Sequence, residues 1–467
     1  MKKLLTYLAF SLFALNSNAE GVGKYLGGDI SDLPLYEQYN YPYLDEGGHK
    51  IDNLLLWLRD ECGWNTFRIR LFVNPTKKNQ KNEADPSVCQ DLDYVKKIGK
   101  RIKDAGCKFM LDFHYSDTWA DPSYQIIPSA WASDTSNDAL ANKVSTYTAD
   151  CLKELKAYGA EPDFVQIGNE ISYGMLTRNN NDKVYPAQGK AQCATQWARL
   201  SLLLNAAAKA VRSNSSAKII VHTERTVSAD QTKNFYNYIS DVDYDIIGLS
   251  YYPFWHGYLT QLSTTLNTLQ TAFPNKPVQI VETAYNFQYS PQSPTYNTSS
   301  TWAYSADGQY KYVTDLVAEL AKHTNVEGLS YWCPEEAGNG DKQDKAVMSG
   351  WINRGFWWQG TGNITGSTSK GHWPVTSSGN FAAKAMKAFL NPETAIINVT
   401  ASPLGSPAVS PLGSPAASPL GSPAIVPEAS ASGSSASSGS HGSTFLTPSG
   451  IVIIKNGARF SINGTQK

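Results

Sequence analysis

Two glutamates stand at the ends of short apolar runs that are typical of β-strands. Residues 164–168 are followed by Asn169 and Glu170, and residues 278–281 are followed by Glu282. Cleavage of a glycosidic bond needs two such carboxyl groups, because one protonates the leaving oxygen and the other attacks the anomeric carbon or activates water. We therefore expect Glu170 and Glu282 to be catalytic residues for this chemistry, if the fold brings the two strand ends together.

Three other acidic residues also follow strand-like runs. Glu224 comes after residues 218–222, and Glu335 and Glu336 come after residues 328–332. None of them is preceded by Asn, as Glu170 is. Glu335 and Glu336 begin a segment rich in Gly and Asp, where charged side chains are expected to be solvated. These three residues therefore rank below Glu170 and Glu282.

Arg68 and Arg70 alternate with Phe67, Ile69 and Leu71, so that both arginines lie on one face of a predicted strand. If that face lines a barrel interior, one arginine can keep a nucleophilic carboxylate ionised by charge-assisted hydrogen bonding. Other strand ends carry polar and aromatic side chains that suit sugar binding, although a single histidine such as His114 is more often structural. The candidate substrate-binding residues are Asp29, Arg68, Arg70, His114, Asp117, Trp119, Asn169, Tyr251, Tyr252, Trp255 and Trp332.

Eight strand-like runs alternate with amphipathic helical stretches between about Leu26 and Leu390. The runs are residues 26–30, 66–72, 109–114, 164–169, 218–222, 246–251, 278–282 and 328–332. Alternation of this kind predicts an α/β fold with parallel strands, and eight repeats favour a closed (β/α)₈ TIM barrel over an open sheet. No run is followed by GxGxxG, which disfavours a dinucleotide-binding sheet. In a barrel the C-terminal strand ends form one rim, which would gather the residues named above.

The composition favours a neutral ligand. Charged residues make up 17% of the chain and the net charge is −1. The chain therefore has no excess of positive charge that would indicate binding to nucleic acid or to an anionic membrane. Aromatic residues reach 12%, with 12 Trp and 26 Tyr. Such a content suits a cleft that stacks on uncharged sugar rings, although a tyrosine-rich core would give the same numbers.

The two ends of the chain differ from its middle. Residues 1–19 combine two lysines, an apolar run and a final Ala19, which predicts a cleaved signal peptide and a secreted or cell-surface protein. No later segment is apolar enough to span a membrane. Residues 20–395 then form the catalytic domain, and residues 396–444 form a disordered linker rich in Pro, Ser and Gly. Residues 445–467 predict a β-hairpin around Asn456-Gly457, which could engage secretion machinery or dock on another surface.

The six cysteines are even in number but scattered, without CxxC spacing. Export permits disulfides, yet the sequence does not choose among the possible pairings, and some thiols could remain free. The spacing predicts no metal cluster, and no motif calls for a cofactor.

Residues 113–122 read Phe-His-Tyr-Ser-Asp-Thr-Trp-Ala-Asp-Pro, and this segment resembles the signature of glycoside hydrolase family 53, the endo-β-1,4-galactanases. Residues 67–75, 167–171 and 250–254 support the resemblance, which extends over nearly the whole predicted barrel. It implies a retaining mechanism, with Glu170 as acid/base and Glu282 as nucleophile, acting on β-1,4-galactan side chains of pectin. The short C-terminal hairpin lies outside this resemblance and more weakly resembles sorting segments of some bacterial secretion systems.

The chain departs from the family pattern at two places. Residues 285–306 lack the acidic loop that holds calcium in some relatives, so we expect no calcium site there. His222-Thr223-Glu224 stands where His-Leu-Asp is more typical, which affects one subsite.

Two other functions stay open at this point. One is a related retaining cellulase, xylanase or mannanase, and the other is an inactive barrel that only binds carbohydrate.

Overall fold

The computed structural model describes residues 23–38, 40–134, 136–291, 293–338, 353–364, 367–391, 443–447, 450–455 and 458–460. The chain divides into two compact units, Met1–Pro403 and Leu404–Lys467. The predicted signal peptide, nearly all of the predicted linker and the Asn456-Gly457 turn lie outside the described residues. Among the described helices, none is long and apolar enough to cross a membrane.

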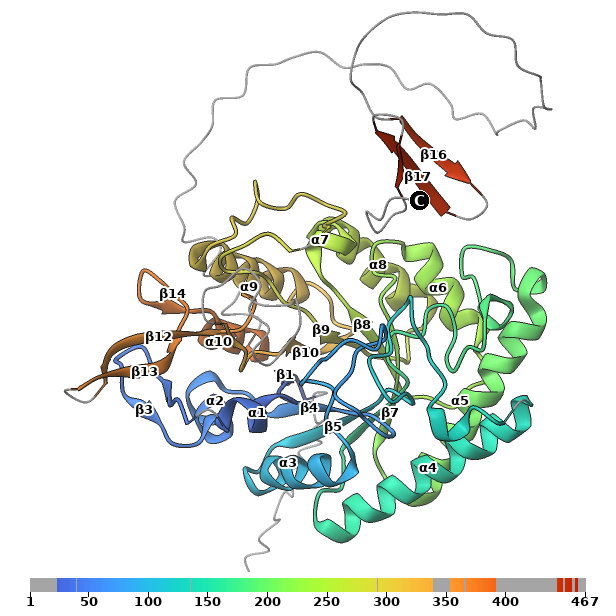
Figure 1. The fold of residues 1–467 in the computed structure, drawn as a ribbon, viewed down its shortest axis with the longest axis horizontal. Helices are drawn as coiled ribbons and strands as arrows, with labels where there is room; N and C mark the ends of the chain where they lie inside the picture. Colours follow the sequence, from blue (N-terminus) through green and yellow to red (C-terminus); the bar gives the residue numbers. More distant parts are fainter. Residues whose placement is uncertain are drawn as a thin grey trace, which may run out of the picture. The chain divides into compact units, whose positions relative to one another are not determined.

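The first unit contains a closed barrel of eight parallel strands (Figure 1). The strands are β1 (Tyr25–Asp29), β4 (Thr66–Leu71), β5 (Lys108–Phe113), β6 (Phe164–Ile167), β7 (Lys218–Thr223), β8 (Ile246–Ser250), β9 (Val278–Glu282) and β10 (Val326–Trp332). β1 closes the barrel because it pairs with both neighbours, so that Gly27 lies opposite Thr66 on β4 and Ser330 on β10. The predicted (β/α)₈ fold is confirmed.

Helices cover the outside of the barrel between successive strands (Figure 1). The longer ones are α2 (Leu54–Cys62), α3 (Leu92–Asp104), α4 (Asn137–Tyr158), α5 (Ala194–Asn214), α6 (Ala229–Tyr238), α8 (Leu259–Ala272) and α9 (Ala306–Leu320). Their ends follow local sequence signals. Asn53 and Asp91 each accept a backbone N–H at the start of α2 and α3, which satisfies an otherwise unpaired donor. Gly63 ends α2 with φ of 71°, a left-handed conformation that costs glycine little.

Strand alternation separates the barrel interior, which is polar around Arg68 and Arg70, from an apolar outer layer. On β4, Phe67, Ile69 and Leu71 belong to the large hydrophobic core, whereas Arg68 and Arg70 are buried in ion pairs. A smaller apolar cluster of strand residues packs separately from this core. Its members are Met110, Phe164, Ile220, Ile246 and Val281.

The described residues after β10 form several short strands and a short helix. They are β11 (Ala337–Gly338), β12 (Trp357–Ile364), β13 (Ser367–Pro374), β14 (Thr376–Ser377), β15 (Asn380–Phe381) and α10 (Ala382–Ala385). β11, β12 and β13 join β2 (Tyr43–Leu44) and β3 (Lys50–Ile51) in a five-stranded sheet beside the barrel (Figure 1). The Gly- and Thr-rich sequence of 359–371 favours this hairpin over a helix.

The second unit contains a three-stranded antiparallel sheet of β16 (Ser443–Thr447), β17 (Gly450–Lys455) and β18 (Ala458–Phe460). β17 and β18 pair with Lys455 opposite Ala458, the register of a hairpin with a two-residue turn. β16 is an additional strand that the sequence pattern did not indicate, and its first two residues fall within the predicted linker.

Candidate active site

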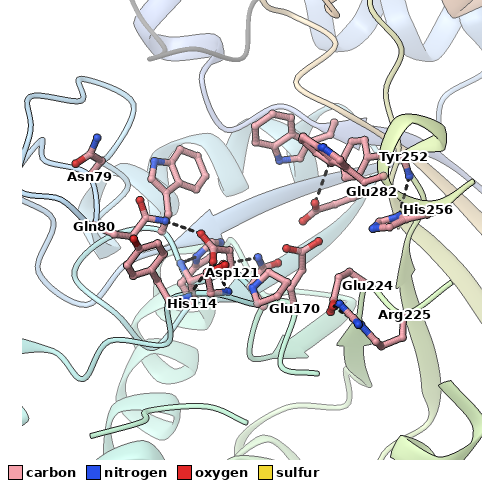
Figure 2. Close-up of a pocket in the computed structure, with 18 of the residues that line it drawn as sticks. Asn79, Gln80, His114, Asp121, Glu170, Glu224, Arg225, Tyr252, His256 and Glu282 are labelled. Carbon is pink, nitrogen blue, oxygen red and sulfur yellow. Dashed lines mark hydrogen bonds and ion pairs between the residues drawn. The ribbon is translucent and has the colours of Figure 1, made fainter. Parts of the chain in front are cut away.

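A pocket with a cavity volume of about 730 Å³ lies at the C-terminal ends of the barrel strands. Eight residues singled out from the sequence line it: His114, Trp119, Asn169, Glu170, Tyr252, Trp255, Glu282 and Trp332. Figure 2 shows Glu170 and Glu282 directed toward the same space from different strands. Asn79 and Gln80 lie toward one end of the pocket, and Arg225 and His256 lie toward the other. The barrel has thus brought the two strand ends together.

Glu170 sits in a strained backbone conformation just beyond β6. Its φ is 47°, in the left-handed region that non-glycine residues rarely adopt, and Gly168 two residues earlier has φ of 101°. The Glu170 N–H donates to Nδ1 of His222 at 3.3 Å. Strained conformations of this kind persist where the surroundings fix them, and they cluster at functional sites. The turn aims the Glu170 side chain into the pocket.

Glu282 is the last residue of β9, and a register shift between β8 and β9 places it directly opposite Ser250. A register shift of this kind marks a β-bulge, and β-bulges change the direction of side chains at strand ends. Glu282 as a whole residue is 6% exposed. Arg68 Nη2 lies 2.9 Å from its Oε1, and the Tyr252 hydroxyl donates to its Oε2 at 3.0 Å. Both contacts favour the ionised form of the carboxyl.

The hydroxyl of Ser250 connects the two glutamates. It donates to Glu170 Oε1 at 2.7 Å and lies 3.4 Å from Glu282 Oε2. His222 Nε2 lies 2.8 Å from the Ser250 oxygen, and burial, reinforced by the Arg68 charge, holds the pKa of His222 well below its usual range. The neutral ring accepts the Glu170 N–H at Nδ1, so its proton is on Nε2 and donates to Ser250.

The environments of the two carboxyls shift their pKa values to different extents. Burial raises the pKa of Glu170 well above its usual range, and repulsion from Glu282 and Glu224 adds to this effect. Burial also raises the pKa of Glu282, but the Arg68 charge and the Tyr252 hydroxyl oppose the shift. A pair of titratable groups separated in this way can divide the roles of acid and base. Glu170 is therefore the group that retains a proton.

Asp29, Arg68 and Arg70, three of the predicted substrate-binding residues, are not among the residues that line the pocket. They form a buried ionic network beneath it, in which Arg68 pairs with Asp29 at 2.9 Å and Asp112 at 2.8 Å. Arg68 also donates to the Asn169 side-chain oxygen at 2.9 Å. The network holds Glu282 and Asn169 in place from behind.

Tyr251 and Asp117, also predicted to bind substrate, are likewise absent from the pocket lining. Tyr251 is fully buried, and its hydroxyl donates to the Gly257 carbonyl at 2.9 Å. Because strand residues alternate in direction, Ser250 points inward and Tyr251 points outward. Asp117 accepts the backbone N–H of Ser129 at 2.8 Å and its hydroxyl at 2.7 Å, and thereby fixes a loop.

His114 and Trp119 belong to the loop after β5. Nδ1 of His114 accepts the Ala120 N–H at 2.9 Å, and its Nε2 lies 3.1 Å from Asp112 Oδ2. Trp119 lines the pocket, and its indole N–H donates to Asp85 at 3.0 Å. His114 therefore ties the loop to the barrel, and this places Trp119 on the pocket wall.

Sequence reasoning missed several pocket residues or ranked them too low. Glu224 lines the pocket and is buried, with a hydrogen bond from Ser172 and an ion pair with Arg225 at 2.6 Å. Its place after the fifth strand was a usable signal. His256, which ends the short helix α7 (Pro253–His256), also lines the pocket. Other missed residues come from loops, whose positions relative to the barrel carry no local sequence signature. They include Asn79, Gln80, Asp85, Arg225 and Tyr296.

The expectation that Glu335 and Glu336 are solvated is wrong, because both side chains are buried. Glu335 accepts the Asp32 N–H at 2.8 Å, and burial together with repulsion from Asp32 raises its pKa well above the usual range. Glu336 pairs with Arg354, with Nε and Oε2 3.2 Å apart. The partners of these two residues come from other parts of the chain, so the local sequence does not reveal their burial.

All six cysteines lie within the described residues and are unpaired thiols. In the same described part of the chain, no group of three or more His, Cys, Asp or Glu side chains is arranged to hold a metal ion.

Comparison with known proteins places this barrel among relatives. The model of Glycosyl hydrolase family 53 matches residues 25–368. An arabinogalactan endo-beta-1,4-galactanase of Cellvibrio japonicus is 33% identical over 347 residues, covering 71% of this chain and 86% of that protein. An arabinogalactan endo-beta-1,4-galactanase A of Emericella nidulans is 32% identical, covering 75% of this chain and 96% of that protein. The solved GH53 catalytic domain of Ignisphaera aggregans superposes with a TM-score of 0.63 at 28% identity, covering 79% of this chain and 96% of that one.

Proposed function

The chain belongs to glycosyl hydrolase family 53, and we propose that this glycoside hydrolase is a secreted endo-β-1,4-galactanase that retains the anomeric configuration of its substrate. The observation that carries the proposal is the pairing of Glu170 and Glu282 through the Ser250 hydroxyl in an aromatic pocket. The galactan specificity comes from the relatives, which are named as galactanases.

The retaining mechanism is supported by the distance between the two carboxyls. Glu170 Oε1 and Glu282 Oε2 both lie close to one hydroxyl oxygen, so they can be no farther apart than the sum of 2.7 and 3.4 Å. An inverting pair needs roughly 6.5 to 9.5 Å to admit a water molecule, whereas a retaining pair is about 5 to 5.5 Å apart. The short separation of the two carboxyls favours direct attack by Glu282 on the anomeric carbon.

In the proposed first step, Glu170 protonates the glycosidic oxygen while the Glu282 carboxylate attacks the anomeric carbon. The leaving sugar departs, and a galactosyl ester of Glu282 remains. Because Glu170 Oε1 accepts from Ser250, the acid proton belongs on Oε2. In the second step, Glu170, now ionised, removes a proton from water. This water attacks the anomeric carbon and releases Glu282.

An endo-acting enzyme must bind a polymer on both sides of the scissile bond. The pocket supports this because its lining continues on both sides of the catalytic pair, toward Gln80 and toward Arg225 (Figure 2). Trp119, Trp255 and Trp332 line it and provide faces for neutral sugar rings. We propose the galactan side chains of pectin as the natural polymer and secretion through the predicted signal peptide. The C-terminal segment would then serve export or surface display.

Digestion of purified polysaccharides tests the proposal. Potato-type galactan should yield short galacto-oligosaccharides, while arabinan, xylan, mannan and cellulose should be cleaved far more slowly. NMR of the first products should detect β-anomers before mutarotation, whereas α-anomers would exclude retention. Faster cleavage of xylan, mannan or cellulose would instead favour a related specificity, and no cleavage of any polymer would favour a binding protein.

A further inference from the structure

Trp332 ends β10 on the wall of the pocket, and a buried arginine stacks against its ring. The guanidinium carbon of Arg354 lies 3.7 Å from the ring centroid. Trp332 is 8% exposed and lines the pocket, whereas Arg354 is 2% exposed and does not line it. Because the guanidinium covers one face of the indole, a sugar in the pocket would rest on the other.

Arg354 is held firmly from behind. Its Nε lies 3.2 Å from Oε2 of Glu336, and both side chains are buried. Its backbone carbonyl accepts the Tyr331 hydroxyl at 2.7 Å and the Gln309 amide at 2.9 Å. The next residue, Gly355, lies so close to the Glu336 backbone that a Cβ atom at 355 would be 2.0 Å from the Glu336 carbonyl oxygen. The two partners are therefore fixed to one another by backbone packing as well as by charge.

A second pocket tryptophan has the same arrangement. The guanidinium of Arg70 lies 4.4 Å from the ring centroid of Trp119, and Arg70 pairs with Asp32 at 2.6 Å. The two indoles also meet edge to face, with their centroids 6.1 Å apart. The pocket thus contains two contacting tryptophans, each backed by a buried arginine that a buried carboxylate neutralises.

A buried arginine is costly unless it is paired, and a pair of this kind adds little stability over an apolar core. Its planar guanidinium does, however, match the face of an indole and restrains the ring in one orientation. We propose that Arg354, neutralised by Glu336, is a positioning residue that fixes Trp332 as the flat surface beneath the sugar at the cleavage point. This inference rests on the proposed function for the identity of that sugar.

According to this inference, Arg354 affects catalysis only through the Trp332 ring. A double-mutant cycle tests this dependence. The cycle comprises Arg354→Met, Trp332→Ala and the double variant, assayed on the polysaccharide that the wild type cleaves fastest. Arg354→Met should lower kcat about tenfold, the scale of a desolvated cation–π contact, with a smaller change in KM. In the Trp332→Ala background, Arg354→Met should cause no further loss. Additive losses, or an unchanged kcat for Arg354→Met, would overturn the inference.

Two further variants keep the test decisive if Arg354→Met folds poorly. Glu336→Gln should lower kcat in the same direction, and Arg354→Lys, which keeps the charge but loses the flat face, should restore only part of the rate. Lys276→Met is a matched control, because it removes a cation–π contact on Tyr244, and neither residue lines the pocket. It should leave kcat and KM unchanged. If the wild type prefers a polymer other than galactan, the galactanase proposal fails while the cycle on that polymer still decides the role of Arg354.

Discussion

Arg68 Nη2 lies 2.9 Å from Oε1 of Glu282, and the two side chains meet inside the barrel with almost no exposure to solvent. The contact joins the second strand of the barrel, β4, to the seventh, β9. It supplies the positive charge that offsets the burial of the Glu282 carboxylate. The pH dependence of catalysis should therefore respond to Arg68, although Arg68 does not line the pocket.

The first prediction concerns that charge. Arg68→Gln should raise the pKa of Glu282, so that the carboxyl becomes protonated at higher pH and the acidic limb of kcat/KM moves upward. A neighbouring opposite charge typically shifts a carboxyl pKa by roughly 1 to 3 units, so a displacement of about 1 unit or more is expected. Arg68→Lys should give a smaller displacement, since one ammonium cannot bridge Asp29, Asp112 and Glu282 together. Arg212→Gln breaks ion pairs outside the pocket and serves as the control. An unmoved acidic limb in folded Arg68→Gln would contradict the prediction.

The second prediction concerns the acid. Glu170→Gln removes the transferable proton and should slow galactan hydrolysis by about 10²- to 10⁴-fold, the usual contribution of general acid catalysis. The raised pKa of Glu170 sets the alkaline limb of the kcat/KM–pH profile of the wild type, so that limb should be absent from the profile of the variant. An aryl galactoside whose leaving group needs no proton should show a smaller loss in the first chemical step. Wild-type rates on galactan would rule out the acid role.

The third prediction concerns Glu224, which was a weaker catalytic candidate than Glu170 and Glu282 on sequence grounds. Its negative charge is the third largest cause of the raised pKa of Glu170, and burial and the charge of Glu282 are the two larger causes. Glu224→Gln should therefore lower the pKa of Glu170, and the alkaline limb of kcat/KM should move to lower pH. Glu154→Gln removes an exposed carboxylate that pairs with Lys96 and should leave the profile unchanged. A shift of the alkaline limb to higher pH, or none, would show that Glu224 does not act on Glu170.

The fourth prediction concerns the end of the catalytic domain. A variant ending at Asn391 should keep the melting temperature and galactan turnover of the full chain, because it retains α10 and the buried side chains of Met386 and Phe389. A variant ending at Gly379 removes these side chains, together with the Ala383 carbonyl that accepts the Trp64 indole N–H. It should melt at lower temperature. If the Asn391 variant lost stability or activity, the C-terminal segment would have to be part of the catalytic fold.

Most of the barrel could be predicted because its signals are local. Each strand is a short run of apolar and β-branched residues, and the helices α2 and α3 end before Gly63 and Gly106. The predicted strands agree with the observed ones to within two residues at either end. The segment after β10 could not be predicted in the same way, because its five-stranded sheet depends on pairing with β2 and β3, some 300 residues earlier in the chain.

The sequence by itself determined that Glu170 and Glu282 share one rim, since both stand at strand ends and a parallel barrel gathers its strand ends. Only the tertiary structure decided which groups surround them. The Ser250 link between the glutamates and the stacking of Arg354 on Trp332 both depend on contacts between residues that only folding brings together. The burial of Glu335 and Glu336 likewise goes with contacts to Asp32 and Arg354. Burial and pairing are properties of the packed chain, so the pKa values and the positioning of the site follow from the fold.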